Sequence, residues 1–524
     1  MKDQASYKFQ GLKPLFALLC CFWSGPAIAR SVEGSPEFAE IRSYYCSRES
    51  QGEVYNSLAN NVEPASELLK ILSEEEELLS IPSPTEQLPE TRYFEVDLEE
   101  AMEIALGRNR QLQIEEIKLH QQRRTLQAER SRLYPSLSLD GDAERSGLGI
   151  ENSSLSDARD ESYEQLNATI LGAELELNYT AIDGERSARI QEEKLELQSA
   201  KLDLAIAKED LRLDVYREYY DLQEAIALSE IELDAVVTSC RALNIAESKL
   251  EEEDADEEDQ LDVIQARIEL ADDIEDFLES ITLGQKAYYN LARQLGLPIN
   301  LLVRPTANIA PIGRWALSLE GSIVLALNHR DELEKILLER LADRARKKIE
   351  IAAVRPTLSL DASTGIVKVF SDTYEWFPDS AANEDSFEWN YSIGLELNWT
   401  FFDGGRARAR IGRARLAVLR EEIEFARSRD DIRQEVVDAY SDFEENRLSL
   451  PIVESKTEQA FNAAERAQAL FEAGEVSGNT AINAREDLNE AKRDRVRTIL
   501  DYNRALAELR RAAGTNIDER IFGS

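Results

Sequence analysis

Residues 391–406 read YSIGLELNWTFFDGGR, and every odd position from Tyr391 to Phe401 is apolar. The positions between them are polar or small, and the stretch ends in a glycine-rich turn. Residues 171–186 repeat the pattern as LGAELELNYTAIDGER. Alternation with a period of two is typical of a β-strand that has one apolar and one polar face. The sequence therefore predicts two such strands, each followed directly by a turn.

Other parts of the chain are also written twice. Residues 98–112 recur as 319–333 and residues 135–140 as 356–361, both at an offset of 221, and residues 262–267 recur as 480–485 at an offset of 218. Self-similarity at a nearly constant spacing indicates a duplicated structural unit. We therefore expect an internal two-fold repeat, with repeat 1 over residues 94–298 and repeat 2 over residues 315–514, each beginning with a helix.

A second strand precedes each alternating stretch. These earlier strands begin at Pro135 and Pro356, and a polar loop separates each from its partner, at residues 151–165 and 372–387. We expect the resulting strand pairs to span residues 135–180 and 356–402.

The apolar faces of these strands have two interpretations. A soluble β-sandwich would pack them inward. A membrane strand carries aromatic residues near its ends, where it meets the lipid headgroups, and needs about 9 to 11 residues to cross the hydrocarbon. Both features are present, and the aromatic candidates for the headgroup position are Tyr179, Tyr391, Trp399 and Phe401. The polar faces carry Glu174, Glu176, Glu396 and Asn398, which are candidates for lining a wet lumen.

Long helices follow the strand pairs. Residues 185–283 contain no glycine or proline and are rich in residues that favour helices. Two apolar series lie about 200° apart around the helix axis; they are Leu195, Leu202, Ile206 and Leu213, and Leu204, Leu211, Val215 and Leu222. Because both flanks are apolar, the helix needs a neighbour on each side. This favours the wall of a helical cylinder over a two-stranded coiled coil, with an ordinary bundle helix as the alternative.

Each helical stretch is interrupted once, so we expect two long helical hairpins, at residues 184–297 and 404–513. In repeat 1 the break is the acidic run 251–259, whose like charges repel one another within a helix. In repeat 2 it is the segment from Gly474 to Gly478.

The first helix of each hairpin should run from Glu185 to about Leu250 and from Gly405 to about Ala473, roughly 100 Å at 1.5 Å per residue. Pro451 lies inside the second of these helices and should kink it. The returning helices should end near the stop signals Gly296 and Gly514.

Residues 1–29 have the features of a cleavable secretory signal, with early lysines, an apolar run and a small-residue ending. Cys20 and Cys21 lack the small residue that precedes the acylated cysteine of a lipoprotein. After the signal, no apolar stretch of about 18 residues predicts a transmembrane helix. We expect an exported chain with an N-terminal extension and linker at 30–93, a second linker at 299–314 and a tail at 515–524.

The chain has 61 basic and 102 acidic residues, a formal net charge of −41. Because like charges repel, this argues against nucleic acid or an anionic lipid surface as the main partner. His120 and His329 lack metal-ligand spacing, so we expect solvated surface positions and no cofactor. Cys46 and Cys240 are too few for a disulfide scaffold and too far apart for pairing to be inferred, so we expect ordinary structural residues.

Four alternating strands per chain are too few for a membrane barrel. A barrel must close to satisfy its edge hydrogen bonds and usually has at least about eight strands. Two copies would give eight strands, with an interior filled by side chains, whereas three would give twelve and leave room for water. We therefore expect a homotrimer whose twelve strands form one membrane barrel, continued by a long α-helical barrel, in a mainly α protein.

The ordered blocks of the two repeats resemble those of the TolC-like outer membrane efflux proteins. The blocks are Leu-x-x-Ala-x-x-x-Ala-Leu, Pro-Ser-Leu-Ser, Phe-Asp-Gly-Gly-Arg and Asp-Val-x-x-Ala-Arg, between about Phe94 and Gly514. The resemblance implies a trimeric, twelve-stranded barrel in the outer membrane lipid, a helical tunnel across the periplasm and a gate at its periplasmic tip.

The resemblance also implies where the gate lies. Its positions are Asp262, Gln265 and Arg267 in repeat 1 and Thr480, Asn483 and Arg485 in repeat 2, next to Gly474 and Gly478. In one family member aspartates stand where this chain has Thr480 and Asn483. The acidic run would supply a replacement ring that attracts cations, or it is a solvated turn; its acidic members are Glu251, Glu252, Glu253, Asp254, Asp256, Glu257, Glu258 and Asp259.

No phosphate-binding loop, cysteine–histidine cluster or nucleophile elbow occurs in the sequence, so we expect no enzyme. A chain without an energy source would be a passive conduit in tripartite efflux or type I secretion. The resemblance implies an inner-membrane pump of the RND or ABC type and a periplasmic adaptor. The alternative is a soluble periplasmic coiled-coil scaffold or adaptor, which leaves the alternating strands unexplained.

Overall fold

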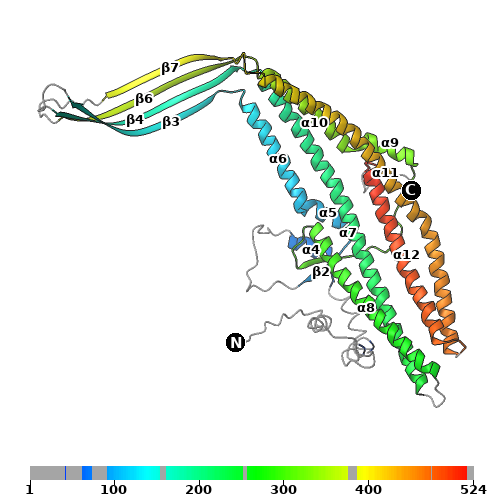
Figure 1. The fold of residues 1–524 in the computed structure, drawn as a ribbon. Coiled ribbons are helices and arrows are strands. Elements are labelled where there is room, and N and C mark those ends of the chain that lie inside the picture. Colours follow the sequence, from blue (N-terminus) through cyan, green and yellow to red (C-terminus); the bar gives the residue numbers. More distant parts are fainter. Residues whose placement is uncertain are drawn as a thin grey trace, which may run out of the picture. The chain divides into compact units, whose positions relative to one another are not determined.

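The computed structural model describes Arg42, Cys46 and residues 62–72, 91–153, 161–251, 257–375, 386–473 and 475–515. These residues form two compact units (Figure 1). The first unit comprises residues 1–114, 205–330 and 431–524, and the second comprises residues 115–204 and 331–430. The two longest helices, α7 (Arg186–Leu250) and α11 (Arg406–Glu472), contribute to both units.

The second unit holds a four-stranded antiparallel sheet. Its strands are β3 (Ser136–Ser153), β4 (Glu161–Ile182), β6 (Thr357–Glu375) and β7 (Ser386–Asn398), in the spatial order β3-β4-β6-β7 (Figure 1). The alternating pattern predicted these two strand pairs. Pairing of β4 with β6 joins the two repeats in one sheet.

The register keeps the two faces of the sheet distinct. One row across the four strands consists of Leu137, Leu177, Ala362 and Ile393, and the row beside it on the opposite face consists of Ser138, Glu176, Ser363 and Ser392. The first row is apolar and the second is polar. A one-residue slip in any strand would mix the faces, so the alternation fixes the register.

The glycine-rich turns after β4 and β7 begin the long helices. Gly404 and Gly405 have φ angles of 70° and 93°, which an L side chain rarely adopts. Asp403 accepts hydrogen bonds from the backbone nitrogens of Gly405 at 3.0 Å and Ala407 at 2.7 Å. In repeat 1, Asp183 accepts the equivalent bond from Glu185 at 2.8 Å. The aspartate therefore caps the first turn of each helix.

Shorter helices in each repeat precede the strands. They are α5 (Leu98–Arg108) and α6 (Arg110–Ser131) in repeat 1 and α9 (Leu319–His329) and α10 (Asp331–Ala352) in repeat 2. Both α5 and α9 have side-chain N-caps, Asp97 and Ser318. The duplicated sequence thus reproduces the same helix start in both repeats.

The first unit contains the parts of both helical hairpins that follow residues 204 and 430. Helix α7 returns as α8 (Glu257–Gln294), and α11 returns as α12 (Gly478–Ala512). Gly296 and Gly514, the predicted stop signals, follow α8 and α12 with φ angles of 70° and 69°. Helix α11 continues without a break through Pro451. In the described part of the chain, no helix is long and apolar enough to cross a membrane.

A second sheet lies where the sequence predicted linkers. Strands β1 (Val62–Pro64), β2 (Arg92–Val96) and β5 (Leu301–Pro305) form a parallel sheet, and α4 (Ala65–Leu72) follows β1. The linker prediction was wrong for these segments. The strands have only three to five residues, and the buried run Leu301-Leu302-Val303 has no polar face, so no alternation marks them.

Cys46 and Cys240 form a disulfide across 194 residues of sequence, which corrects the expectation of unpaired structural cysteines. Cys240 lies in the apolar core between α7 and α8, with Leu243, Leu270 and Phe277. Cys46 packs against the same core. Folding brings the two cysteines together through a contact that their spacing does not reveal.

Candidate functional site

The predicted gate was placed at the turn ends of the two hairpins. Glu257 and Asp259 begin α8, where the helix dipole favours acidic residues, and Glu251 follows α7. Predicted residues that lie outside the described residues are Glu252, Glu253, Asp254, Asp256 and Gly474, and the side chain of Glu258 is not described.

Asp262 and Gly478, both predicted gate residues, lie against each other. A Cβ atom on Gly478 would come within 3.0 Å of Oδ2 of Asp262 and 3.3 Å of the Phe471 ring. Glycine therefore allows the start of α12 to approach α8 closely. The carboxylate of Asp262 lies beside the N-terminus of α12, where the helix dipole favours a negative charge.

A second contact joins the same two hairpins. The ammonium nitrogen of Lys249, at the end of α7, lies 3.8 Å from the centroid of the Phe471 ring, near the end of α11. This is a cation–π contact. With the Asp262–Gly478 contact, it ties the turn ends of repeat 1 and repeat 2 together.

Arg267 is used within its own hairpin. Its guanidinium donates to Glu247 on α7 at 3.2 Å, and Arg42 donates to the same carboxylate at 3.0 and 2.6 Å. Burial acts to raise the pKa of Glu247, but the hydrogen bonds from both arginines outweigh it and lower the pKa below its ordinary value. Arg42 and the Cys46 disulfide thus attach the N-terminal segment to the first hairpin.

Arg485, another predicted gate residue, also makes a contact between the hairpins. From α12 its guanidinium donates to the backbone carbonyl oxygens of Asp234 at 3.4 Å and Ala235 at 3.5 Å, both on α7. Burial lowers its pKa, while the carboxylates of Asp273, Asp234 and Glu269 act in the opposite direction. The guanidinium of Arg485, on α12 of repeat 2, therefore lies against α7 and near carboxylates of α8, both in repeat 1.

Around Arg485 lies a group of acidic side chains that we call the carboxylate cluster: Glu269 and Asp273 on α8 and Glu486 on α12. Burial raises the pKa of Glu269 to about 7, and the charges of Asp273 and Glu486 add to the effect. Burial also raises the pKa of Asp273 to about 6, although a hydrogen bond from Ser239 and the charge of Arg485 oppose it. Both groups titrate near neutral pH.

Ion pairs continue along the seam between α7 and α12. Arg493 donates to both oxygens of Glu232 at 2.9 Å, and Lys492 lies 3.2 Å from Asp234. The remaining pairs are Arg504 with Glu224 and Asp221, Arg511 with Asp210, and Arg217 with Glu508. Sequence analysis missed this ion-pair ladder. The signal was present as arginines at positions 493, 497, 504 and 511, spaced by four and seven residues along one face of α12.

The other predicted gate residues have fewer contacts. Thr480 and Asn483 are exposed, and Gln265 is half-buried. The hydroxyl of Thr480 lies 3.2 Å from that of Ser477. The structure brings Asp262 to Gly478 and places Arg485 against α7.

The sheet divides its predicted residues between its faces. Glu174, Glu176, Glu396 and Asn398 lie on the polar face, and Tyr179 and Tyr391 lie on the apolar one. Trp399 and Phe401 follow β7, with ring centroids 6.2 Å apart, and both side chains are exposed. The apolar side chains of β7 that face outward include Ile393, Leu395 and Leu397, which are 76%, 71% and 67% exposed. Such a surface indicates a contact with lipid or protein.

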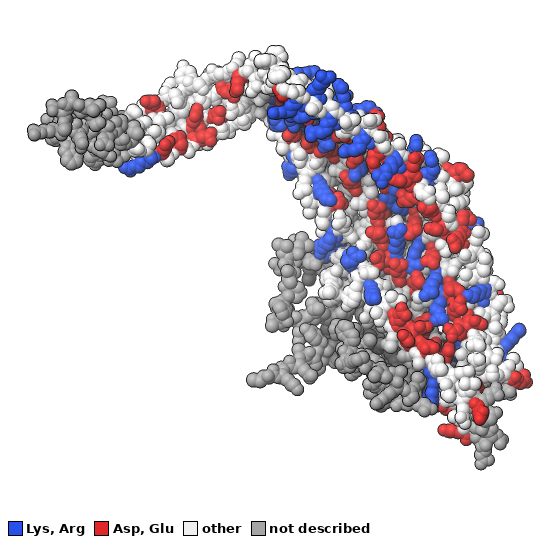
Figure 2. Space-filling view, in the orientation of Figure 1, with Lys and Arg blue, Asp and Glu red and all other residues white. Residues whose placement is uncertain are grey.

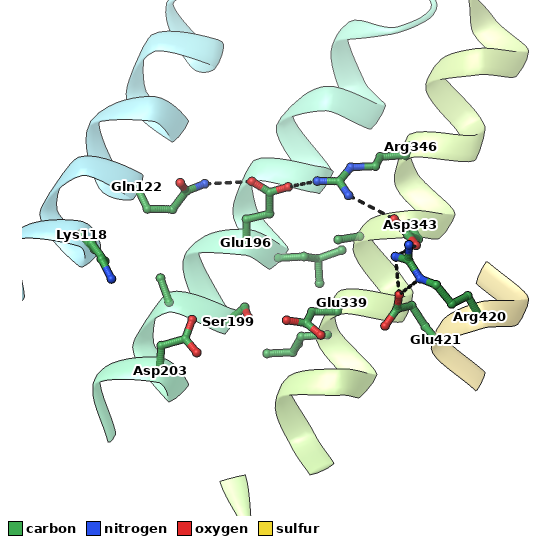
Figure 3. A pocket seen from close by; sticks show the side chains of 14 residues that line it. Lys118, Gln122, Glu196, Ser199, Asp203, Glu339, Asp343, Arg346, Arg420 and Glu421 are labelled. Carbon is green, nitrogen blue, oxygen red and sulfur yellow. Dashed lines mark hydrogen bonds and ion pairs between the residues drawn. The ribbon is translucent and has the colours of Figure 1, made fainter. Parts of the chain in front are cut away.

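A cavity of about 510 Å³ lies among α6, α7, α10 and α11 in the second unit. Its lining is bridged by Gln122, Glu196, Arg346 and Asp343, as Figure 3 shows. Arg346 donates to Glu196 at 2.5 Å and to Asp343 at 3.2 Å. Opposite charges therefore face one another across the cavity. Among the described residues, no group of three or more potential metal ligands occurs.

The fold thus consists of two long helical hairpins from a duplicated sequence and a four-stranded sheet with one apolar and one polar face. The family model for outer membrane efflux proteins matches residues 101–296 and 322–515, so the chain belongs to that family. Its place is the outer membrane, with a helical extension in the periplasm. Among curated proteins, none matches this sequence.

Solved structures of three channels have the same fold. The outer-membrane channel OprN has 18% identity and a TM-score of 0.60, covering 80% of this chain and 90% of its own. The CmeC channel of Campylobacter jejuni has 18% identity and a TM-score of 0.63, covering 80% and 87%. The MtrE channel of Neisseria gonorrhoeae, solved in its open state, has 17% identity and a TM-score of 0.60, covering 80% and 89%.

Proposed function

We propose that three copies of the chain close a twelve-stranded barrel in the outer membrane, continued by a helical barrel that conducts solutes from the periplasm to the exterior. The observation that carries the proposal is the four-stranded sheet with one apolar and one polar face. Within the chain, the sheet ends at β3 and β7. In lipid, strand edges must be paired, and pairing β7 of one copy with β3 of the next satisfies both edges.

The two faces of the sheet then have separate roles. Tyr179, Tyr391, Trp399 and Phe401 meet the headgroups. The polar residues Glu174, Glu176, Glu396 and Asn398 line the aqueous lumen. Their carboxylates favour cations there.

The turn ends of the hairpins form the periplasmic entrance. Asp262 and the acidic run set its ion selectivity, and Arg485 together with the ion-pair ladder holds the two repeats closed against each other. Support comes from the contacts that join the repeats at Asp262, Lys249 and Arg485. Opening the entrance requires these contacts to break or rearrange.

Transport energy comes from an inner-membrane pump of the RND or ABC type, and a periplasmic adaptor joins the pump to the hairpins. Proteins of this family generally work with an adaptor and an inner-membrane pump. The alternative of a soluble periplasmic scaffold is not favoured, because the family match includes both strand pairs.

Planar bilayer recording tests the conduit directly. We expect stable single-channel currents that prefer cations. A triple variant, Glu174→Lys, Glu176→Lys and Glu396→Lys, should move the reversal potential towards anions, because it reverses the charge of the polar face. Glu103→Lys, on α5 and not part of the sheet, is the control and should leave the potential unchanged. Absence of current, or a triple variant with unchanged selectivity, would contradict the proposal.

A further inference from the structure

The first three turns of α11 carry an unusual set of arginines. Within residues 404–420 the sequence contains six arginines and no acidic residue. The five that begin the helix, which we call the arginine collar, are Arg406, Arg408, Arg410, Arg413 and Arg415. Figure 2 shows Lys and Arg gathered over the strand-proximal ends of α10 and α11. The equivalent start of α7, residues 184–200, has three basic and four acidic residues, so the repeat does not require this composition.

Helix stability does not explain the collar. A helix N-terminus carries partial positive charge, so cations in the first turn are unfavourable, and α11 has no acidic residue there. Arg406 and Arg410 are four residues apart, and Arg410 and Arg413 are three apart, spacings at which like charges repel one another on one face of the helix. The collar therefore weakens its own helix unless anions lie against it.

The chain itself supplies few anions to the collar, and one of them is Asp403, which caps α11 and attracts the charge of Arg406. Glu350 on α10 lies 3.6 Å from Arg410 and 3.8 Å from Arg413, so one carboxylate serves two guanidiniums. For Arg408 and Arg415, the described part of the chain provides no carboxylate within 4.0 Å. All five collar side chains are exposed. Each copy therefore presents an excess of positive charge here, although its net charge is −41.

The collar begins just beyond the aromatic end of the sheet. Trp399, Phe401 and Phe402 are 57%, 84% and 81% exposed, and α11 starts four residues after Phe402. At 1.5 Å per residue, the collar occupies about the first 15 Å of the helix. In the membrane placement of the proposed function, on which this inference rests, these aromatics lie at the headgroups of the periplasmic leaflet. The guanidiniums then lie at the level of the lipid phosphates or just beyond.

We propose that the arginine collar binds anionic glycerophospholipids of the periplasmic leaflet through their phosphate groups. A guanidinium matches a phosphate with two parallel hydrogen bonds, and basic clusters next to a membrane attract anionic lipids. A neutral headgroup lacks the net negative charge that the excess of arginines needs. Bound lipid would offset the repulsion within α11 and fix the height of the sheet in the membrane.

Lipid retention tests the collar. The purified full chain is placed in vesicles of phosphatidylethanolamine with a minor fraction of phosphatidylglycerol, re-extracted in mild detergent, and its retained phospholipids are measured by mass spectrometry. The wild type should hold phosphatidylglycerol at least about threefold above its fraction in the vesicle, because each basic residue near the surface favours an anionic lipid. At 1 M salt, where the screening length is about 3 Å, the enrichment should fall.

Variants separate the collar from the rest of the helix. Changing all five collar arginines to glutamine should abolish the enrichment, whereas changing them to lysine should keep most of it. The matched control changes Arg427, Arg429, Arg433, Arg447 and Arg466 to glutamine, farther along the same helix, and should behave as the wild type. If the fivefold variant fails to fold, the pair Arg408→Gln and Arg415→Gln, which breaks no ion pair of the described chain, should still lower the enrichment.

Assembly mass and single-channel current are measured on the same samples. Unchanged enrichment in a folded collar variant that still conducts would overturn the lipid proposal and leave the proposed function standing. If the wild type assembles but the collar variant separates into single chains, the lipid proposal is overturned. The collar arginines would then bind acidic side chains of a second copy. A wild type that neither assembles nor conducts would mark failure of the proposed function itself.

Discussion

Arg485 on α12 donates a hydrogen bond at 3.4 Å to the backbone carbonyl oxygen of Asp234 on α7, and the carboxylate of Asp234 lies 3.2 Å from Lys492. One residue of repeat 1 therefore receives two basic side chains from the returning helix of repeat 2. The duplicated halves are joined by charge as well as by the shared sheet. In the proposed channel, these contacts would have to break before the turn ends could separate.

The most buried ion pair of the ladder joins Arg493 to Glu232. The two side chains are only 18% and 6% exposed, so Arg493→Ala leaves a carboxylate buried without its partner. We expect a loss of roughly 3 kcal/mol in the stability of the seam. Faster hydrogen exchange in α12 and larger or more frequent channel openings would report it. Arg495→Ala, an exposed neighbour, is the control and should change neither measurement.

The carboxylate cluster predicts an unusual dependence on pH. The folded chain raises the pKa of Glu269 and Asp273 from 4.5 and 3.8 to about 7 and about 6. At pH values between the ordinary pKa of each group and its raised pKa, the folded state holds protons that the unfolded state releases. Stability contributed by the cluster therefore falls as pH rises from about 4 to about 7.

Thermal unfolding at pH 5 and pH 8 tests this prediction. The double variant Glu269→Gln and Asp273→Asn should show a smaller difference between the two pH values than the wild type. Glu275→Gln, an exposed position on the same helix, should keep the wild-type difference. A double variant with the full wild-type dependence would assign the effect to other groups.

Asp262 and the acidic run predict cation selectivity at the entrance. Asp262→Asn, and a variant in which the run 251–259 is neutralised, should each reduce the preference for cations in single-channel recordings, most clearly at low salt where charges are poorly screened. Reversal potentials that stay unchanged in both variants would show that the entrance charges do not select ions. Asp272→Asn, an exposed site farther along α8, is the control.

The disulfide predicts a redox effect on the first hairpin. Reducing the Cys46–Cys240 bond should lower thermal stability by a shift that corresponds to about 2–4 kcal/mol, because the bond restricts the unfolded chain. Cys46→Ser should show the lower stability without reductant and no further response to it. A wild type that responds to reductant no more than Cys46→Ser does would contradict the assignment.

The sequence predicted the long elements well for a physical reason. The starts of α7 and α11 follow from the glycine turns after Asp183 and Asp403, and their ends from the acidic run after Leu250 and the glycine segment after Ala473. The strand faces follow from alternation over many residues. Strand β5 has five residues and a fully apolar centre, which no periodicity can identify.

The candidate site was only partly predictable. The family resemblance pointed to Asp262 and Arg485 but did not give their contacts, because Gly478 and Asp234 lie on other helices far away in sequence. The pairing of Cys46 with Cys240 depends in the same way on folding of the first hairpin. Contacts of this kind are set by tertiary packing, which local patterns do not encode.

In the proposed function, three chains share one barrel. Native mass spectrometry of the protein extracted from membranes in mild detergent measures the number of chains in the assembly. We expect a single species of three chains. A monomer or a dimer under conditions that preserve channel activity would contradict it.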